Sequence, residues 1–296
     1  MRKNTDHPET AREAFVQASQ ALADAGYNPE DARREANKLL SFCLGEDGLR
    51  LLLDFDRILC PEEEKQYWDA VRRFANKEPM AYLTGEQDFG NVTIQLEPGV
   101  LIPRQDTLVL VEAAIEKLAE DRETHVLELG SGSGAVIVAI AIARPLMQGL
   151  AVDVDPLAVE WTRRNLNRFG LDRRIQVRLG SWFEKINTDQ RFSMIVANPP
   201  YISTEEMKEL DDAVKYEPVT ALWGGADGMD AYREIVPAAY GALDEGGWCL
   251  VEIGWKQGPA VKNMFEAAGF QDVAVYLDEG GRDRVVAGKR AQAHDV

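Results

Sequence analysis

The sequence predicts an α/β fold with a mainly parallel, doubly wound sheet, and three observations predict it. From residue 125 onward, short apolar runs typical of buried strands alternate with segments of helical spacing. A glycine-rich loop follows the first of these strands and opens an apolar helix. A later apolar run ends at Ala197 and is followed at once by Asn198-Pro199-Pro200-Tyr201. Polar groups therefore follow the carboxyl end of a strand, where open α/β sheets bind ligands.

The N-terminal part of the chain, from residue 10 to about 78, has the apolar spacing of helices. A first helix ends at Gly26, a second opens at Asn28-Pro29, a short one is expected over residues 49–53, and another begins at Pro61. No group of residues typical of a catalytic site is evident here, and the acidic side chains are interpreted as a solvent-exposed face. The more specific hypothesis is a small all-helical domain, residues 1–85, that positions a macromolecular substrate.

Residues 86–103 change in character and are interpreted as a β-hairpin linker. Apolar and polar residues alternate around Val92–Leu96, as in a half-buried strand, and residues 100–102 are expected to form the second strand after a Pro98-Gly99 turn. The sheet domain then spans residues 104–296. We expect its first helix, residues 108–118, to be capped by Asp106 or Thr107.

The sheet domain is expected to contain seven strands, of which the last two pair antiparallel. The expected strands are residues 125–129, 149–153, 174–179, 192–197, 248–253, 272–277 and 284–287. The expected helices between them are residues 135–143, 157–169, 231–243 and 258–268. Alternation of this kind favours crossover connections, and hence parallel pairing in most of the sheet.

Composition and charge exclude several classes of protein. The net charge of −17 and the pI of about 4.7 argue against broad electrostatic binding to nucleic acid or to an anionic membrane. No apolar run has the length of a membrane span, and the N-terminus has no signal core. The three separated cysteines are typical of reduced thiols, which predicts a cytoplasmic protein. His7, His125 and His294 share no ligand spacing, so no metal site is expected.

The glycine loop is the candidate cofactor site. Its sequence is Gly130-Ser131-Gly132-Ser133-Gly134, and three glycines in five residues let a ligand approach the backbone closely. The spacing differs from the Gly-x-Gly-x-x-Gly of dinucleotide folds. The next strand ends at Asp153, whose carboxylate can accept both ribose hydroxyls, and Asp155 is the alternative. With Glu128 supporting the loop, the pattern fits S-adenosyl-L-methionine, and NAD is its main rival.

The Asn198–Tyr201 tetrad is the candidate catalytic site. Its two prolines remove two backbone donors and restrict φ, so the Asn198 side chain and the Pro199 carbonyl become acceptors on a stiff frame. Such a frame suits a planar group that carries an NH2, although an ordinary Asn-Pro turn is the alternative. Ser181 and Trp182 follow the third strand and are placed to contact an adenine, while Trp182 alternatively belongs to the core.

These residues resemble a known family. Glu128–Gly134, Asp153 and Asn198–Tyr201 are similar to the class I, Rossmann-like methyltransferases that modify planar nitrogen. Further stretches make the chain similar, over nearly its whole length, to the peptide chain release factor glutamine methyltransferases of the HemK/PrmC type. These stretches are residues 78–86, 98–104, 217–233, 252–258 and 281–286. Departures from the usual family residues occur at Gln105, Leu108, Ser181 and Trp255.

The resemblance implies a seven-stranded class I methyltransferase sheet, S-adenosyl-L-methionine as methyl donor and no metal. It implies that the acceptor is the glutamine of the Gly-Gly-Gln motif in class 1 peptide chain release factors. The Asn198 oxygen and the Pro199 carbonyl would then accept the two N–H bonds of the glutamine amide, with Pro200 and Tyr201 completing the catalytic and substrate-binding tetrad. We expect a monomer that contacts neither membrane nor nucleic acid.

Three alternatives share parts of the pattern. A glutamine methyltransferase of a ribosomal protein would share the tetrad and differ in its acceptor. A nucleic-acid amino-methyltransferase would also share it, but the charge of −17 and the lack of a segment for base flipping or target recognition disfavour that class. A catalytically silent S-adenosylmethionine-binding module would not need an intact Asn198.

Overall fold

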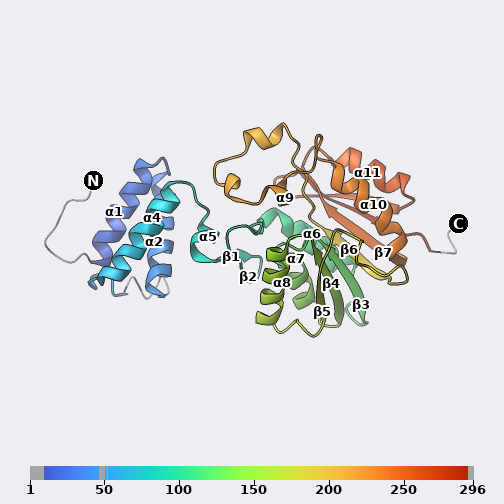
Figure 1. The fold of residues 1–296 in the computed structure, drawn as a ribbon, viewed down its shortest axis with the longest axis horizontal. Coiled ribbons are helices and arrows are strands. Elements are labelled where there is room, and N and C mark those ends of the chain that lie inside the picture. Colours follow the sequence, from blue (N-terminus) through green and yellow to red (C-terminus); the bar gives the residue numbers. More distant parts are fainter. Residues whose placement is uncertain (1–9, 47–50, 52, 293–296) are drawn as a thin grey trace. The chain divides into compact units, whose positions relative to one another are not determined.

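The structure is a computed structural model, and it describes residues 10–46, 51 and 53–292. The chain divides into two compact units, and the division falls between Gly85 and Glu86. Figure 1 shows the fold of each unit. The helix expected over residues 49–53 lies partly outside the described residues. Among the residues described, no helix is both long enough and apolar enough to cross a membrane.

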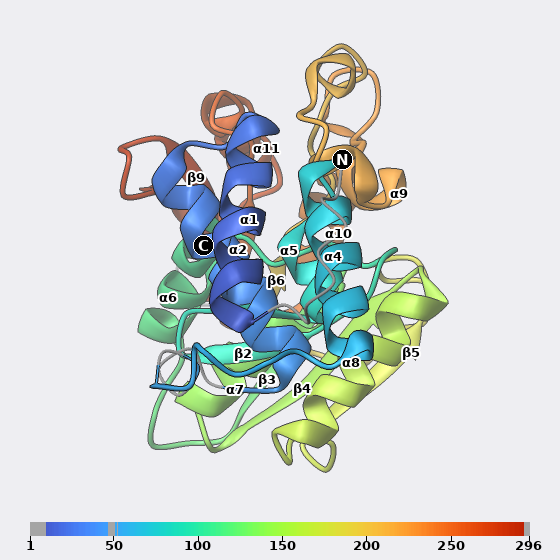
Figure 2. The ribbon, with the colours of Figure 1, turned by 90° about the vertical axis from the view of Figure 1, so that its left-hand side faces the viewer.

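The first unit is helical. Its helices are α1 (Ala11–Asp24), α2 (Pro29–Leu44), α4 (Pro61–Ala75) and α5 (Met80–Thr84). Helices α1, α2 and α4 lie side by side in both views (Figures 1 and 2) and bury small and aliphatic side chains between them. Thr10 and Glu13 form a capping box at the start of α1, and Asn28 caps α2. The helical periodicity in this part of the sequence therefore reflects a real core.

The second unit begins with a β-hairpin whose strands differ from those expected. Strand β2 (Val92–Gln95) pairs antiparallel with the preceding strand β1 (Glu86–Phe89). The expected second strand, residues 100–102, is wrong, because this segment forms no ladder. Instead, the main-chain N–H of Ile102 donates to the Glu217 carboxylate across 2.9 Å.

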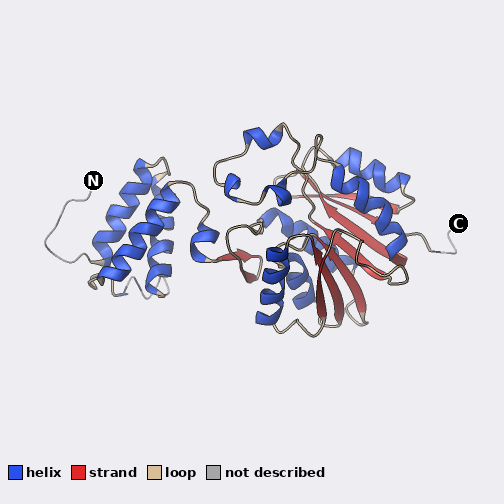
Figure 3. Ribbon diagram, in the orientation of Figure 1, coloured by secondary structure: helices blue, strands red, loops and turns tan. Residues whose placement is uncertain are grey.

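The main sheet has seven strands in the order β5-β4-β3-β6-β7-β9-β8, and it is parallel except where β9 pairs with β7 and β8. In chain order its strands are β3 (Thr124–Leu129), β4 (Met147–Asp153), β5 (Ile175–Leu179), β6 (Phe192–Ala197), β7 (Leu243–Glu252), β8 (Gln271–Leu277) and β9 (Asp283–Lys289). Figure 3 shows the strands as one twisted layer. The predicted seven-stranded, mostly parallel α/β sheet is confirmed, as is the antiparallel pairing of the last two strands.

Helices cover both faces of this sheet. One core contains side chains of α6 (Leu108–Lys117), α7 (Ala135–Ala143) and α8 (Pro156–Arg168). The other contains those of α10 (Asp230–Ala242) and α11 (Gly258–Ala267). Between β6 and α10 the chain forms two short 3₁₀ turns, η2 (Glu206–Glu209) and η3 (Val214–Tyr216), and the short helix α9 (Val219–Leu222). This two-layer cover leaves the carboxyl edge of the sheet to the loops that follow β3, β4 and β6.

The expected side-chain cap of α6 is absent. Residues Gln105–Thr107 form a short 3₁₀ turn, η1, that runs directly into α6, and Thr107 has a helical conformation with no capping hydrogen bond. Its hydroxyl instead accepts a hydrogen bond from Asn198. The carboxylate of Asp106 lies 3.1 Å from the Arg284 guanidinium. Both side chains are therefore engaged in tertiary contacts.

Candidate active site

The glycine loop is a tight turn between β3 and α7. Gly130, Gly132 and Gly134 have φ angles of 73°, 55° and 80°, in a left-handed region of the backbone that residues other than glycine rarely adopt. The N–H of Gly130 donates to the Val152 carbonyl at 2.8 Å, which ties the loop to β4. A Cβ at Gly134 would lie 3.0 Å from the Thr162 side chain, whereas one at Gly132 would meet nothing within 4 Å. Gly134 thus permits helix packing, and Gly132 keeps space free.

Asp153 ends β4 beside this loop. One carboxylate oxygen accepts from the Gly132 N–H at 2.8 Å, and the other accepts from the Asp155 N–H at 2.9 Å. Burial raises the pKa of Asp153, and these two N–H groups oppose the rise. The carboxylate of Asp155 is committed to a different task, because it accepts from the Leu157 N–H at 2.8 Å and so caps α8.

Glu128 lies under the loop, on β3, and is buried. Burial holds its pKa well above the usual value, and the nearby Asp153 charge raises it further, against one backbone hydrogen bond from Ile137. Its Oε2 atom has no hydrogen-bond partner. The two serines of the loop are buried as well. Ser131 lies 3.0 Å from the Thr162 hydroxyl, and the Ser133 carbonyl accepts from the Asn165 amide at 2.9 Å. Both fix the loop from below.

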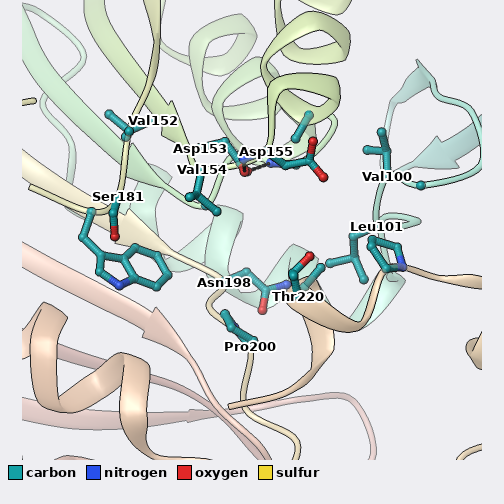
Figure 4. A pocket seen from close by; sticks show the side chains of 18 residues that line it. Val100, Leu101, Val152, Asp153, Val154, Asp155, Ser181, Asn198, Pro200 and Thr220 are labelled. Carbon is teal, nitrogen blue, oxygen red and sulfur yellow. Dashed lines mark hydrogen bonds between the residues drawn. The ribbon is translucent and has the colours of Figure 1, made fainter. Parts of the chain in front are cut away.

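A cavity of about 260 Å³ opens at this edge of the sheet (Figure 4). Eight of the residues singled out from the sequence line it: Gly130, Gly132, Asp153, Asp155, Ser181, Trp182, Asn198 and Pro200. The other six, Glu128, Ser131, Ser133, Gly134, Pro199 and Tyr201, are not among its lining residues. The structure thus brings the glycine loop, the acid at the end of β4 and two members of the tetrad, Asn198 and Pro200, to one cavity.

Two walls of the cavity carry no site residue expected from the sequence. One wall consists of Gly99, Val100 and Leu101. The other consists of Pro218, Thr220 and Ala221. Glu217 joins the two walls, because its side chain, only 1% exposed, forms an ion pair with Arg104 and accepts from the Ile102 N–H. The sequence contained one indication of these walls, because residues 98–104 and 217–233 resemble stretches of a known family. That resemblance assigned these residues no role in binding.

Trp182 serves two purposes. It lines the cavity and also packs against the buried core between the sheet and helices α10 and α11. The backbone φ of Trp182 is 38°, which is unusual for an aromatic residue. Its neighbour Ser181 also lines the cavity. The adenine-contact and core interpretations are therefore compatible with each other.

The tetrad is held by its surroundings. The Asn198 Nδ2 donates to Thr107 Oγ1 at 3.2 Å. Gln257 donates to the Tyr201 carbonyl at 3.0 Å, and a Cβ at Gly224 would lie 2.6 Å from the Pro200 carbonyl oxygen. Burial raises the pKa of the Tyr201 hydroxyl, as does the charge of Glu252. The tetrad is therefore a tightly packed frame.

Within the part of the chain that the structure describes, no group of three His, Cys, Asp or Glu residues is arranged to hold a metal ion. The polar groups at the cavity are the carboxylates of Asp153 and Asp155, the Asn198 amide, the hydroxyls of Ser181 and Thr220, and the backbone of the glycine loop. This donor set suits hydrogen bonds to hydroxyl and amide groups.

Known proteins share both the fold and the sequence. The family described as PrmC N-terminal domain matches residues 13–85, and the family described as Methyltransferase small domain matches residues 107–215. The hMettl16 catalytic domain, solved in complex with MAT2A 3′UTR hairpin 6, superimposes with a TM-score of 0.57 at 13% identity, over 78% of this chain and 82% of that one. The methyltransferase family match and the seven-stranded sheet together place this chain among the Rossmann-like methyltransferases of class I.

Curated relatives narrow this class. The release factor glutamine methyltransferase of Geobacter sulfurreducens is 42% identical over 288 residues, which is 96% of this chain and 99% of that protein. That of Moorella thermoacetica is 38% identical over 93% of this chain and 96% of that protein. The chain belongs to the release factor glutamine methyltransferase family.

Proposed function

We propose that this protein transfers a methyl group from S-adenosyl-L-methionine to the side-chain N5 nitrogen of the glutamine in the Gly-Gly-Gln motif of class 1 peptide chain release factors. The relatives that share 38–42% of its residues are named for release factor glutamine methylation. The observation that carries the proposal is the position of Asn198, which directly follows the parallel strand β6, lines the cavity and donates from its amide nitrogen to Thr107. The amide oxygen is thereby left as the acceptor.

The residues at the cavity fit this methyl donor. Asp153 uses one lone pair of each carboxylate oxygen for backbone N–H groups, so each oxygen retains acceptor capacity for a ribose hydroxyl. The absence of side chains at Gly130 and Gly132 leaves room for the methionine portion, and Trp182 provides an aromatic surface for the adenine. Glu128, Ser131, Ser133 and Gly134 act from beneath by holding the loop in shape.

The bound donor supplies an electrophilic methyl group on a positively charged sulfur. An amide nitrogen is a poor nucleophile, because its lone pair is delocalised into the carbonyl. The Asn198 side-chain oxygen and the Pro199 carbonyl accept hydrogen bonds from the two N–H groups of the glutamine amide. These hydrogen bonds direct the amide nitrogen toward the methyl group and favour a pyramidal geometry at that nitrogen. The rate then comes from orientation and from fixed dipoles matched to the transition state. After the transfer the amide nitrogen carries the methyl group and both of its hydrogens. Such an N-protonated amide is very acidic and loses one proton readily, so no strong general base is required.

The test uses radiolabelled S-adenosyl-L-methionine and three acceptors: a class 1 release factor, the same factor with its tip glutamine changed to alanine, and ribosomal protein from the same cells. We expect label only in the unmodified release factor. Equal labelling of the alanine variant would refute the glutamine assignment. Labelling of a ribosomal protein alone would assign the enzyme to that acceptor.

A further inference from the structure

The side chain of Gln257, in the loop between β7 and α11, reaches the last residue of the tetrad. Its Nε2 donates to the Tyr201 carbonyl at 3.0 Å and to the Gly228 carbonyl at 3.1 Å. Its Oε1 accepts from the Gly254 N–H at 2.8 Å and lies 3.2 Å from the Tyr232 hydroxyl. One side-chain amide therefore ties together the main chain after β6, before α10 and after β7.

The orientation of this amide is dictated by its partners. A main-chain carbonyl only accepts hydrogen bonds, and a main-chain N–H only donates them. The carbonyls of Tyr201 and Gly228 therefore require the NH2 group, and the Gly254 N–H requires the oxygen. A carboxylate of the same shape would set an oxygen without a proton against two carbonyl oxygens. Glutamine thus suits this position, and glutamate does not.

Two glycines make room for the Gln257 side chain beside the tetrad. A Cβ at Gly228 would lie 2.3 Å from the Tyr201 carbonyl oxygen and 2.8 Å from Gln257 Nε2. A Cβ at Gly254 would lie 3.0 Å from Gln257 Oε1 and 3.5 Å from Tyr201 Cδ2. Because the main chain approaches the amide this closely at both glycines, Gln257 has little freedom to move away from Tyr201.

The segment that follows the tetrad is closed by a short pairing and by this amide. The Ile202 N–H donates to the Leu222 carbonyl at 2.9 Å, and the Gly224 N–H donates to the Ile202 carbonyl at 2.9 Å. The amide bonds to the main chain just outside this pairing on both sides, at Tyr201 and at Gly228. The segment enclosed in this way carries one wall of the cavity.

We propose that Gln257 is a positioning residue that, through the Tyr201 carbonyl, holds the tetrad in the geometry that accepts the substrate amide. This inference rests on the proposed function, since the exact place of the tetrad matters only for an acceptor that donates N–H groups to it. The Pro199 carbonyl lies two residues before the carbonyl that Gln257 holds. Pro200 lies between them with a fixed φ, so a shift at Tyr201 displaces the Pro199 carbonyl as well.

The methyl-donor side of the cavity does not depend on this amide. Asp153 is held by the N–H groups of Gly132 and Asp155, and the N–H of Gly130 bonds to the Val152 carbonyl. Loss of the Gln257 hydrogen bonds should therefore slow methyl transfer and leave cofactor binding intact. A general loss of structure would affect both.

The test compares Gln257→Glu with wild type in methyl transfer to a release factor. Glutamate keeps the size of the side chain and the acceptor for Gly254 but, when ionised, has no proton for Tyr201. We expect kcat at pH 8 to fall at least about tenfold, because misplaced reacting groups cost up to about 100-fold. The Kd for S-adenosyl-L-methionine should stay near the wild-type value. Relative to wild type, activity should recover in part toward pH 5, since a protonated glutamate can donate again.

Two further variants separate positioning from folding. Gln257→Met keeps the volume without hydrogen bonds, and it should be slow at pH 8 with no recovery at lower pH relative to wild type. Gln271→Glu is the matched control, because it makes the same change at an exposed position that begins β8, and its kcat should match wild type at both pH values. Thermal unfolding and the cofactor titration show whether each variant is folded.

Three results would overturn the inference: an unchanged kcat in Gln257→Glu, a loss that does not vary with pH, or a parallel loss of affinity for S-adenosyl-L-methionine. An inactive wild type would instead contradict the proposed function.

Discussion

The main-chain N–H of Gly132 donates to Oδ2 of Asp153 across 2.8 Å, so the glycine loop and the acid of the neighbouring strand form a single hydrogen-bonded unit. A loop that follows β3 is thereby fixed by the residue that ends β4. Loss of the acid should then affect the shape of the loop as well as the contact to ribose. This double role separates Asp153 from Asp155, which caps a helix.

Asp153→Ala should weaken binding of S-adenosyl-L-methionine by about 100-fold or more, because it removes a charged acceptor and leaves the Gly132 and Asp155 N–H groups unpaired. Isothermal titration calorimetry measures the change. The control is Asp155→Asn, in which asparagine still caps α8, so the Kd should stay within about threefold of wild type. Equal losses in the two variants would move the ribose contact to Asp155.

Gly132→Ala and Gly134→Ala should differ in whether cofactor binding or stability suffers the greater loss. Both force a side chain into a left-handed conformation, which costs about 1–2 kcal/mol. At Gly134 the new methyl also meets Thr162 at 3.0 Å, so this variant should lose more stability in urea denaturation. At Gly132 the methyl meets no protein atom within 4 Å and enters the cavity, so cofactor binding should be the greater loss.

Asn198→Ala should abolish methyl transfer while cofactor binding changes only a few-fold. The alanine variant retains the strand, the two prolines and the Pro199 carbonyl but loses the side-chain acceptor for the glutamine amide, and loss of one such fixed dipole costs about 100-fold or more in kcat. Single-turnover transfer and calorimetry with S-adenosyl-L-methionine, run on the same preparation, separate the two effects. Turnover near the wild-type rate would exclude Asn198 from the catalytic role.

Glu252→Gln should stabilise the protein at pH 8 relative to pH 5. Burial raises the pKa of Glu252 from 4.5 to about 7, so the folded state favours the protonated form. The contribution of Glu252 to stability is full below pH 4.5 and is lost as the pH rises through about 7. The free-energy difference between the variant and wild type should change by about 3 kcal/mol across this window. Urea denaturation at both pH values measures it, and a difference that does not vary with pH would contradict the prediction.

Glu217→Ala should loosen the cavity walls. It leaves the Ile102 N–H without its acceptor and breaks the ion pair with Arg104, which should lower the free energy of unfolding by about 2 kcal/mol. Cofactor binding should weaken several-fold, because Leu101 and Pro218 line the cavity on either side of this pair. A double-mutant cycle with Arg104→Met isolates the contribution of the ion pair. Additive effects would show that the walls are held independently.

Local patterns in the sequence predict the central elements well. Strand β6 and helix α7 begin and end at the expected residues, because β6 is an apolar run between Arg191 and Asn198 and α7 is one between Gly134 and Arg144. The hairpin was mispredicted for the converse reason: β1 is a polar, mostly exposed segment, so the alternation in β2 gave no sign of which side its partner lies on. Strand β7 begins at Leu243 instead of Trp248, since its glycine pair is typical of a loop.

Contacts within the site were less accessible to sequence analysis. Asn198 and Thr107 are 91 positions apart, and Glu217 and Ile102 are 115 apart, so their hydrogen bonds exist only after the sheet has formed. Thr107 was expected to cap a helix, a reasonable local role for threonine before an apolar run. No periodicity distinguishes a threonine that caps from one that bridges to a catalytic amide.

The seam between β3 and β6, where the strand order reverses, has an evolutionary consequence. On the proposed assignment, donor recognition belongs to the β4 side of the seam, and acceptor recognition belongs to the segment that leaves β6 and returns at Gly224. Residues 218, 220 and 221 of that segment also form one wall of the cavity, so replacing the segment changes the acceptor side and that wall together, while the glycine loop and Asp153 are inherited unchanged. Duplicated genes could diversify in this way through a single interchangeable insert.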